Sequence, residues 1–438
     1  MESSDERRHV PRTDVVLADK RVLQAGRELS MSTVKAAVRA AQARVRAGEL
    51  TASDIVDEVL AALPERATSL RPVLNATGVV LHTNIGRAPL SAAAVQAVLA
   101  AAGYVDVEYD LDTGQRARRG RGALAALGEA VPAAEAALIV NNGAAALVLA
   151  TTALAAGRDV VVSRGEMVEI GDGFRLPELI ASTGARLREV GTTNRTSARD
   201  YEAAVTPETG CILKVHPSNF RVEGFTSSAS TAELAELGVP VVVDIGSGLL
   251  QPDYLLPDEP NATTALAAGA SVVTCSADKL LGGPQAGLIL GQATVVETLR
   301  RHPLARALRV DKLTLAALEA TIRGPGTRTH HYLHADIGQL KERAERLAAP
   351  FSANVVRSVG VVGGGGAPGL ELPGWAASFP APWAAALRRG NPAVVARIEH
   401  DQCLVDLRCI PESSDADVLA ALLRVRAGRR VQGPAPVS

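Results

Sequence analysis

Short apolar runs alternate with amphipathic stretches along most of the chain after Leu70. The runs are continuous series of Val, Ile and Leu, as in "DVVVSRGE", "GCILKVHPSN", "PVVVDIGSG", "ASVVTCSADK" and "GLILGQA". Strands that are covered on both faces carry such continuous runs, and helices between them supply the crossovers of a parallel sheet. The pattern therefore predicts an α/β domain with a mainly parallel sheet over residues 71–330.

The two ends of the chain follow other patterns. In "MSTVKAAVRAAQARVRAGEL", apolar residues recur at Val34, Val38 and Val45, which indicates an amphipathic helix, and "TASDIVDEVLAALPERA" indicates a second one. We expect residues 1–70 to form a separate helical domain. After the sheet region, a long charged helix and further strand-like runs predict a smaller α+β domain over residues 331–438.

The 438-residue chain is too long for one core, so two or three domains are expected. Its formal net charge of −1 gives no global attraction to a nucleic-acid backbone. "MESSDERRHV" lacks the apolar segment of a signal peptide, and no stretch approaches the about 18 apolar residues of a membrane span. We therefore expect a cytoplasmic protein without membrane contact.

Four cysteines are scattered along the chain, with no C-x-x-C spacing. This distribution favours buried thiols over disulfides or a zinc site, and no metal site is expected. The cysteines are Cys211, Cys275, Cys403 and Cys409.

Charge is divided unevenly between the two amino-terminal helices. Residues 12–46 hold eight basic and three acidic side chains, whereas residues 49–65 hold five acidic and no basic ones. With about 100° per residue, Lys35, Arg39 and Arg46 share one narrow stripe of the first helix. This stripe is either a solvated helix face or a surface that contacts RNA.

The stretch "TCSADKLLGGPQAG" places Lys279 directly after an apolar run and before two glycines. Only six of the 46 basic residues are lysines, so arginine supplies most of the positive charge. An amine can lose its proton and form a Schiff base with an aldehyde, which a guanidinium cannot do. The apolar, glycine-rich context of Lys279 therefore favours a chemical role over a surface role.

Other residues of the same region meet the remaining requirements of a pyridoxal phosphate (PLP) site. Asp244 ends the run "PVVVDIGSG", where a carboxylate can hold a pyridine nitrogen protonated. "NNGAAA" opens a helix whose first N–H groups can bind a phosphate, and Ser276 can add a hydroxyl. The residues at this helix start are Asn142, Gly143 and Ala144. Each signal is weak alone, but their order along one sheet predicts PLP as the cofactor.

Four longer stretches carry a resemblance to a known family. They are "RPVLNATGVVLHTNIGRAPLS", "SRGEMVEIGDGFRLPE", "CSADKLLGGPQAG" and "LARALRVDKLT". Together, and over nearly the whole chain, they resemble bacterial selenocysteine synthases, the L-seryl-tRNA(Sec) selenium transferases. The resemblance implies a PLP-dependent fold of the aspartate-aminotransferase type (fold type I). It also implies conversion of seryl-tRNA(Sec) to selenocysteinyl-tRNA(Sec) with selenophosphate, by β-elimination to a dehydroalanyl-tRNA intermediate and addition of selenium.

The resemblance further implies roles for single residues and an assembly. Lys279 is then the Schiff-base lysine, and Asp244 is the partner of the pyridine nitrogen. The implied selenophosphate site consists of Arg87, Arg306 and Arg309. The family binds seryl-tRNA through its amino-terminal domain and forms homo-oligomeric rings of dimers. Pro217 and Phe220 stand where the family has Thr and Tyr, which puts hydroxyl contacts from these two positions in doubt.

Some residues allow more than one interpretation. His82 in "LHTNIGR" either lies over the cofactor or caps its loop. The basic run "QRARRGRG" contacts tRNA, contacts a partner subunit or is an inert loop, and Arg119 is our tRNA-contact candidate within it. The arginines of this run are Arg116, Arg118, Arg119 and Arg121. "VVGGGGAPG" (361–369) matches no nucleotide-binding motif and is interpreted as an ordinary turn.

Two other functions compete with the selenium transferase. One is a PLP-dependent lyase acting on a small amino acid or amino sugar, which would have no need of the amino-terminal domain. The other is a tRNA-binding protein without catalytic activity. The presence of both Lys279 and Asp244 argues against that third hypothesis.

Overall fold

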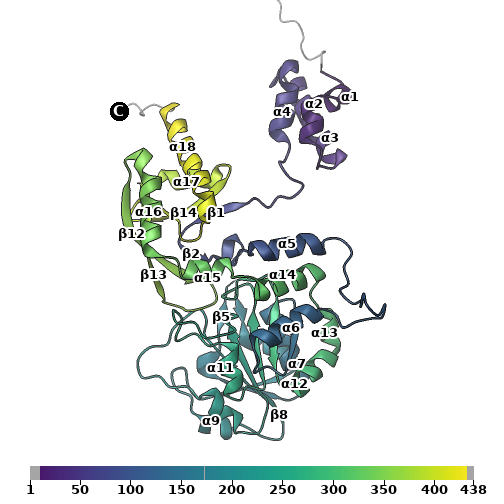
Figure 1. The fold of residues 1–438 in the computed structure, drawn as a ribbon, viewed down its shortest axis with the longest axis vertical. Coiled ribbons are helices and arrows are strands. Elements are labelled where there is room, and N and C mark those ends of the chain that lie inside the picture. The colour runs from purple at the N-terminus through teal and green to yellow at the C-terminus, as the bar shows by residue number, and fades with distance from the viewer. Residues whose placement is uncertain (1–9, 172, 432–438) are drawn as a thin grey trace, which may run out of the picture. The chain divides into compact units, whose positions relative to one another are not determined.

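The computed structural model describes residues 10–171 and 173–431 (Figure 1). The chain divides into two compact units, Met1–Pro72 and Val73–Ser438. The sequence pattern had placed this boundary at residue 70. Within the described residues, none of the helices is both long enough and apolar enough to cross a membrane.

Among its described residues, the amino-terminal unit contains four α-helices. They are α1 (Thr13–Leu17), α2 (Lys20–Ala25), α3 (Met31–Ala47) and α4 (Ile55–Ala62), with a 3₁₀ turn at Ala52–Asp54. The Ser30 hydroxyl accepts a hydrogen bond from the N–H of Thr33 at the start of α3, and Gly48 ends this helix with a φ of +76°. Val38 and Val59 are fully buried between the helices, which confirms the predicted amphipathic helices.

The central sheet of the second unit has seven strands in the described ranges, in the order β3-β11-β10-β9-β8-β4-β7. Their bounds are β3 (Ala136–Val140), β4 (Asp159–Ser163), β7 (Arg186–Val190), β8 (Thr209–Val215), β9 (Val241–Gly246), β10 (Val272–Ser276) and β11 (Gly287–Gly291). All neighbours are parallel except that β11 runs antiparallel to β3 and β10. Every residue of β4, β10 and β11 is buried. The mainly parallel sheet with strands covered on both faces is thus confirmed.

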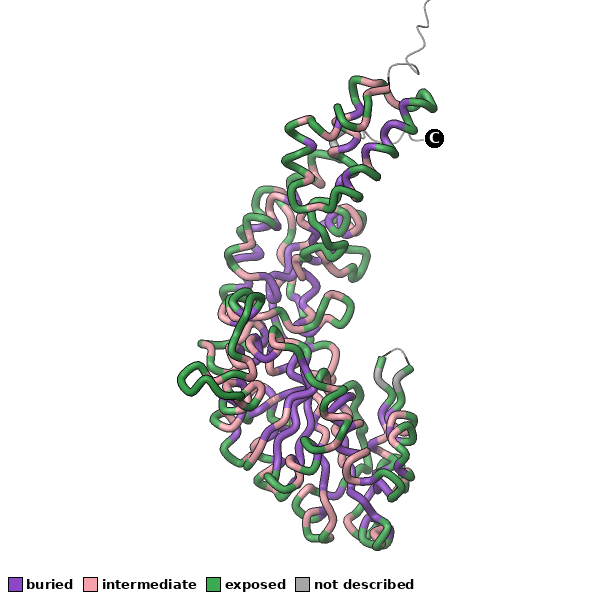
Figure 2. The backbone as a smooth tube through the Cα atoms, turned by 90° about the vertical axis from the view of Figure 1, so that its right-hand side faces the viewer, coloured by how far each residue is buried: buried purple, intermediate pink, exposed green. Residues whose placement is uncertain are grey.

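Helices lie on both sides of this sheet, and its strands form the buried centre of the unit (Figures 1 and 2). Val161 of β4 packs in one core with Leu318 of α14 (Lys312–Arg323), whereas Val160 packs in another with Leu147 of α7 (Gly143–Ala155). Successive residues of a strand point to opposite faces, so one run supplies both cores. The other helices here are α5 (Ala92–Ala101), α6 (Arg121–Ala130), α8 (Leu176–Ser182), α9 (Ala198–Glu202), α10 (Thr231–Ala235), α11 (Ala262–Ala267), α12 (Ala293–Arg301), α13 (Pro303–Ala307) and α15 (Arg328–Leu333).

A second sheet contains six strands within the described part of the chain, in the order β1-β14-β15-β13-β12-β2. The strands are β1 (Val73–Ala76), β2 (Val79–Leu81), β12 (Asn354–Gly363), β13 (Glu371–Pro380), β14 (Ala393–Glu399) and β15 (Gln402–Asp406), and the helices beside them are α16 (Ile337–Ala348), α17 (Pro382–Arg389) and α18 (Asp415–Val431). We expected residues 71–330 to form the large domain, but β1 pairs with β14 and β2 pairs with β12. The second compact unit therefore begins in the second sheet, and the chain enters the large domain through the segment after Leu81.

The four cysteines are free and buried, as predicted. Burial raises the pKa of the Cys211 and Cys275 thiols to about 12, so both are protonated at neutral pH. They behave as small core side chains.

Candidate active site

Lys279 lies in the turn that connects β10 to β11, at the carboxyl end of the parallel strands. Backbone hydrogen bonds fix this turn: the N–H of Leu280 donates to the carbonyl of Ser247 at 2.8 Å, and the N–H of Gly282 donates to the carbonyl of Lys279 at 2.9 Å. Ser247 follows β9, so the turn is tied to the neighbouring strand. This edge is where open α/β sheets bind their ligands.

Asp244 lies on β9 opposite Thr274 of β10, and the Thr274 hydroxyl donates a hydrogen bond to its carboxylate at 2.9 Å. Burial raises the pKa of Asp244, whereas the Thr274 hydrogen bond and the positive charge of Lys279 lower it. Burial also lowers the pKa of the Lys279 amine, and the Asp244 carboxylate acts in the opposite direction. The two strands thus bring together the lysine and the aspartate that the sequence predicted.

The start of α7 lies beside Ser276, at the end of β10. The Asn142 side chain caps the helix by accepting the N–H of Ala145 at 2.8 Å. A Cβ on Gly143 would lie 2.5 Å from the Ser276 hydroxyl oxygen, so only glycine leaves room there. The first N–H groups of a helix have no acceptor within it, and those of Gly143 and Ala144 are available to an anion. All four predicted phosphate-binding residues therefore gather at one helix end.

The glycine run that follows β12 packs against Lys279. A Cβ on Gly365 would lie 2.5 Å from Cδ of Lys279, and a Cβ on Gly366 would lie 3.0 Å from Leu280. Gly365 has a φ of +101°, which other residues rarely adopt. The interpretation of residues 361–369 as an ordinary turn was therefore incomplete. The glycines of this segment leave the space that the Lys279 side chain occupies. Four consecutive glycines were the available signal for a close approach.

His82 directly follows β2, and its side chain makes no cap of the 3₁₀ turn Thr83–Ile85. Its Nδ1 atom is buried without a hydrogen-bond partner in the described residues. A buried ring nitrogen without a partner is unfavourable in the protein alone. His82 therefore does not cap its loop, and the unpaired nitrogen fits the other interpretation, contact with a bound group.

Arg87 forms an ion pair with Asp278, the residue before Lys279, with 2.7 Å between Nη1 and Oδ2. Burial has the largest effect on the pKa of the Lys279 amine, and the Asp244 carboxylate has the second largest. The positive charge of Arg87 comes third, and it lowers this pKa further. Arg87 lines a cavity of about 270 Å³ together with Arg328 and Tyr332. The predicted anion-site arginine thus lies next to the lysine.

Arg306 and Arg309 line a different cavity, of about 620 Å³, between α13 and the loop that precedes α6. Glu108 holds this cavity's wall together: its carboxylate lies 3.2 Å from Arg119, 3.2 Å from Arg309 and 3.3 Å from Arg116. The hydrogen bond from Arg119 lowers the pKa of Glu108. The positive charges of the neighbouring guanidinium groups lower it further. Sequence reasoning missed Glu108, because a single acid gives no motif.

Within one chain, the three predicted anion-site arginines therefore line two cavities. Arg119, our tRNA-contact candidate, is largely enclosed and donates a further hydrogen bond to the carbonyl of Val310 at 2.9 Å. Arg121 pairs with Asp106 at 2.8 Å, while Arg118 remains exposed at the cavity rim.

On α3, Lys35, Arg39 and Arg46 are exposed, beside the helix face that carries the buried valines. The neighbouring arginines are paired: Arg21 contacts Asp57 at 2.7 Å, and Arg44 contacts Glu58. Among the residues that the structure describes, the three stripe residues form no ion pair. The acidic side chains of α4 thus pair with Arg21 and Arg44, and not with the three stripe residues.

The two departures from the family pattern lie after β8. Phe220 is exposed, and Pro217 lines a cavity with His216. The N–H of His216 donates to the carbonyl of Asp244 at 2.9 Å, and its ring lies 3.4 Å from the buried Glu259. His216 was not singled out from the sequence, although it supports the strand that carries Asp244.

We predict that Gly365→Ala weakens the binding of PLP by at least about tenfold, because its Cβ meets Lys279 and the variant residue is strained by about 1–2 kcal/mol. The measurement is a titration of the apo-protein with PLP, followed by visible absorbance. Gly238→Ala is the control, since Gly238 also has positive φ but open space around it. Equal affinities of the two variants would contradict the contact with Lys279.

We also predict that the pH dependence of PLP uptake changes in Arg87→Met. Uptake needs the neutral Lys279 amine, so its rate should rise with pH, with a midpoint below the ordinary lysine value of 10.5. Losing Arg87 removes a positive charge and frees Asp278, and both changes favour the protonated amine, so the midpoint should move to higher pH. Arg328→Met, in the same cavity, should leave the midpoint in place. An unmoved midpoint in Arg87→Met would contradict this electrostatic coupling.

Known proteins resemble this chain in sequence, and others resemble it in fold. Residues 73–411 match the family described as "L-seryl-tRNA selenium transferase", and residues 7–46 match the one described as "Selenocysteine synthase N terminal". The chain is 42% identical to the L-seryl-tRNA(Sec) selenium transferase of Moorella thermoacetica over 98% of both chains. It is 44% identical to that of Geobacter sulfurreducens, over 94% of this chain and 98% of the relative.

Among solved structures, a D-glucosaminate-6-phosphate ammonia-lyase has a TM-score of 0.57 at 20% identity, covering 81% of this chain and 95% of that one. This likeness concerns the fold alone, and it agrees with the expected fold type I. The sequence matches extend over both the helical unit and the sheet that carries Lys279. The chain belongs to the L-seryl-tRNA selenium transferase family.

Proposed function

We propose that this protein converts seryl-tRNA(Sec) to selenocysteinyl-tRNA(Sec) with PLP and selenophosphate, in the cytoplasm. The observation that carries the proposal is the buried Lys279 beside Asp244 at the carboxyl edge of the sheet, in a chain that aligns over 98% of its length with a transferase of this name. PLP would be held by Lys279, by Asp244 at its ring nitrogen and by the start of α7 at its phosphate.

When bound, PLP supplies an electron-withdrawing ring that stabilises negative charge at the α-carbon of an amino acid. The protein's own contribution is to hold and move protons. Burial lowers the pKa of Lys279, so its amine can accept the α-proton of the seryl group. The carboxylate of Asp244 can keep a ring nitrogen protonated, and the Thr274 hydroxyl fixes the orientation of this carboxylate.

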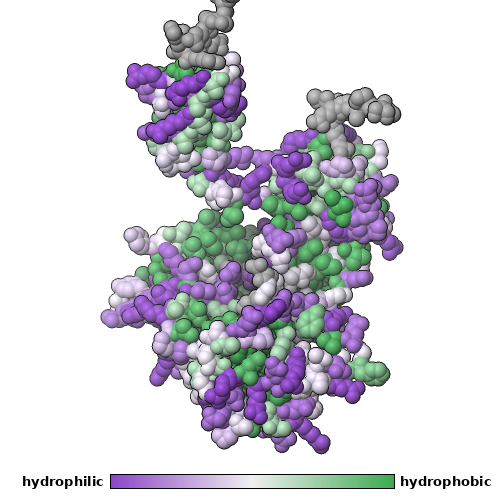
Figure 3. Space-filling model, turned by 180° about the vertical axis from the view of Figure 1, so that it is seen from behind, coloured by the Kyte–Doolittle hydropathy of each residue, from purple (hydrophilic) through white to green (hydrophobic). Residues whose placement is uncertain are grey.

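Selenophosphate would be bound by Arg87, Arg306 and Arg309. A multiply charged anion needs several cations, and guanidinium groups bind its oxygens in pairs. Because the three arginines line two cavities within one chain, a homo-oligomer would let a second copy complete the site. The exposed apolar side chains Leu99, Tyr104 and Leu111 are suited to such a contact, and Figure 3 shows hydrophobic side chains at the surface among hydrophilic ones. The expected ring of dimers remains our proposal for the assembly.

Seryl-tRNA would contact the exposed stripe Lys35, Arg39 and Arg46 of the amino-terminal unit. A small-substrate lyase, the alternative enzyme, has no use for such a unit, and residues 7–46 match a family of selenocysteine synthase amino termini. The lyase is therefore not favoured. A tRNA-binding protein without catalysis would have no need of a buried lysine beside an aspartate.

The direct test incubates the full-length protein with PLP, seryl-tRNA(Sec) and selenophosphate, and identifies the amino acid released from the tRNA by mass spectrometry. We expect selenocysteine, and none from the Lys279→Ala control. Recovery of serine alone would refute the proposed function. Turnover of an amino sugar phosphate by the same preparation would favour the lyase instead.

For the RNA contact, we predict that Lys35→Ala/Arg39→Ala weakens tRNA binding and makes it less sensitive to salt. Each lost phosphate contact should reduce the slope of log K against log salt by about 0.7–0.9. The control Lys20→Ala/Arg27→Ala removes the same charges from exposed positions of the same unit. If both double variants show the same slope, the stripe is only a solvated helix face.

For the anion site, we predict that Arg306→Ala and Arg309→Ala each raise the half-saturating selenophosphate concentration about 10- to 100-fold, the equivalent of one lost charged contact. Formation of the dehydroalanyl group should continue, so elimination and selenium addition separate. Arg323→Ala is the control, because Arg323 pairs with Glu129 at 2.9 Å and neither residue lines the cavity. Unchanged half-saturation in both variants would assign these arginines to RNA or subunit contacts.

A further inference from the structure

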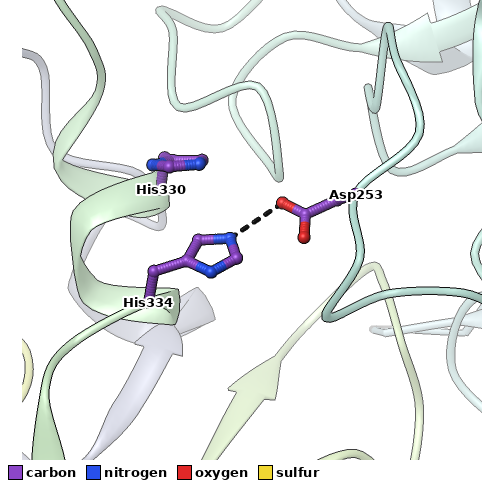
Figure 4. A group of neighbouring side chains, drawn as sticks. All are labelled: Asp253, His330 and His334. Atoms are coloured by element: carbon purple, nitrogen blue, oxygen red, sulfur yellow. Dashed lines mark hydrogen bonds and ion pairs between the residues drawn. The ribbon is translucent and has the colours of Figure 1, made fainter.

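A group of three side chains lies outside the active site, between α15 and the loop that follows β9. His330 and His334 come from α15 and its carboxyl end, and Asp253 comes from the loop (Figure 4). One potential ligand atom from each residue lies within 4.8 Å of the other two. Sequence reasoning expected no metal site and did not single out these histidines.

The geometry follows from the helix. Residues four apart lie on the same face, so His330 and His334 project together, and their ring centroids are 4.3 Å apart. The Asp253 carboxylate lies 2.9 Å from Nε2 of His334. A hydrogen bond between Asp253 and His334 accounts for two of the three residues. It does not account for His330, whose ring makes no hydrogen bond within the described residues.

From this arrangement we infer a binding site for a divalent transition-metal ion of the zinc type, with His330, His334 and Asp253 as ligands. Two imidazoles and one carboxylate suit Zn²⁺ or Co²⁺, whereas Mg²⁺ and Ca²⁺ prefer oxygen ligands alone. Ligand atoms around zinc lie roughly 3.3 Å apart, given bonds of about 2.0–2.1 Å. Small side-chain rotations close the observed group to that spacing, and the exposed His330 leaves a path for the ion.

The surroundings of His334 strengthen the inference. Its second ring nitrogen, Nδ1, lies 3.0 Å from the hydroxyl of Tyr254. Metal-binding histidines typically use their other nitrogen for such a hydrogen bond, which fixes the ring orientation. With the ion on Nε2, Nδ1–H would donate to the Tyr254 oxygen. The site therefore has both its ligands and a partner that orients one of them.

The ion would connect two segments that border the active site. The loop after β9 continues from Asp244, and its Ser247 carbonyl accepts the N–H of Leu280 beside Lys279. The other face of α15 carries Arg328 and Tyr332, which line the cavity of Arg87. A bound metal would hold this helix against the loop and stabilise the folded protein.

The test is isothermal titration calorimetry of the untagged, PLP-loaded, full-length protein with ZnCl₂ in excess MgCl₂. We expect one Zn²⁺ per chain in the wild type, loss of this binding in His330→Ala, and about tenfold weaker binding in Tyr254→Phe. His331→Ala is the matched control, because His331 is an exposed histidine of the same helix outside the group. It should bind like the wild type.

Thermal unfolding separates a metal site from a hydrogen-bonded pair. Without metal, His330→Ala should unfold at the wild-type temperature, because the bond between His334 and Asp253 remains. With saturating Zn²⁺, only proteins that bind the ion should gain stability. Zinc binding that is absent from the wild type, unchanged in His330→Ala, or equally lost in His331→Ala would overturn the inference.

Discussion

The active site depends on burying an amine and a carboxylate together at one end of a parallel sheet. Each charge alone would be costly to remove from water. The Lys279 amine and the Asp244 carboxylate each favour the charged form of the other, while burial acts on both in the opposite direction. Parallel pairing of β9 and β10 fixes their separation, because the strands end at the same edge. Their ionisation therefore responds to small changes in the surrounding structure.

Close backbone packing is the second requirement. Gly143 leaves room for Ser276 at the start of α7, and Gly365 leaves room for Lys279. Gly365 directly follows β12 of the second sheet, which also contains the strand that precedes His82. The second sheet thus contributes to the active site directly, and β1 and β2 join it even though they precede the large domain in sequence.

Features that depend on local pattern were predictable from the sequence. Continuous apolar runs identified the strands, and the residues at their ends identified Asp244 and Lys279. Features that depend on tertiary contact were not. Glu108 brings Arg309 together with Arg116 and Arg119 of a distant loop, and the contact between Gly365 and Lys279 joins residues that are far apart in the chain. The sequence also could not predict that Arg87 and Arg309 line two different cavities, because spacing along the chain does not define which cavity a side chain lines.

The proposed chemistry requires Lys279, and no other lysine, to bond to PLP. It is tested most directly by reducing the PLP-loaded protein with sodium borohydride, digesting it and locating the pyridoxyl group by mass spectrometry. We expect modification of Lys279 alone. Stoichiometric modification of another lysine, such as Lys214, which is ion-paired with Glu166 at 3.0 Å, would contradict it.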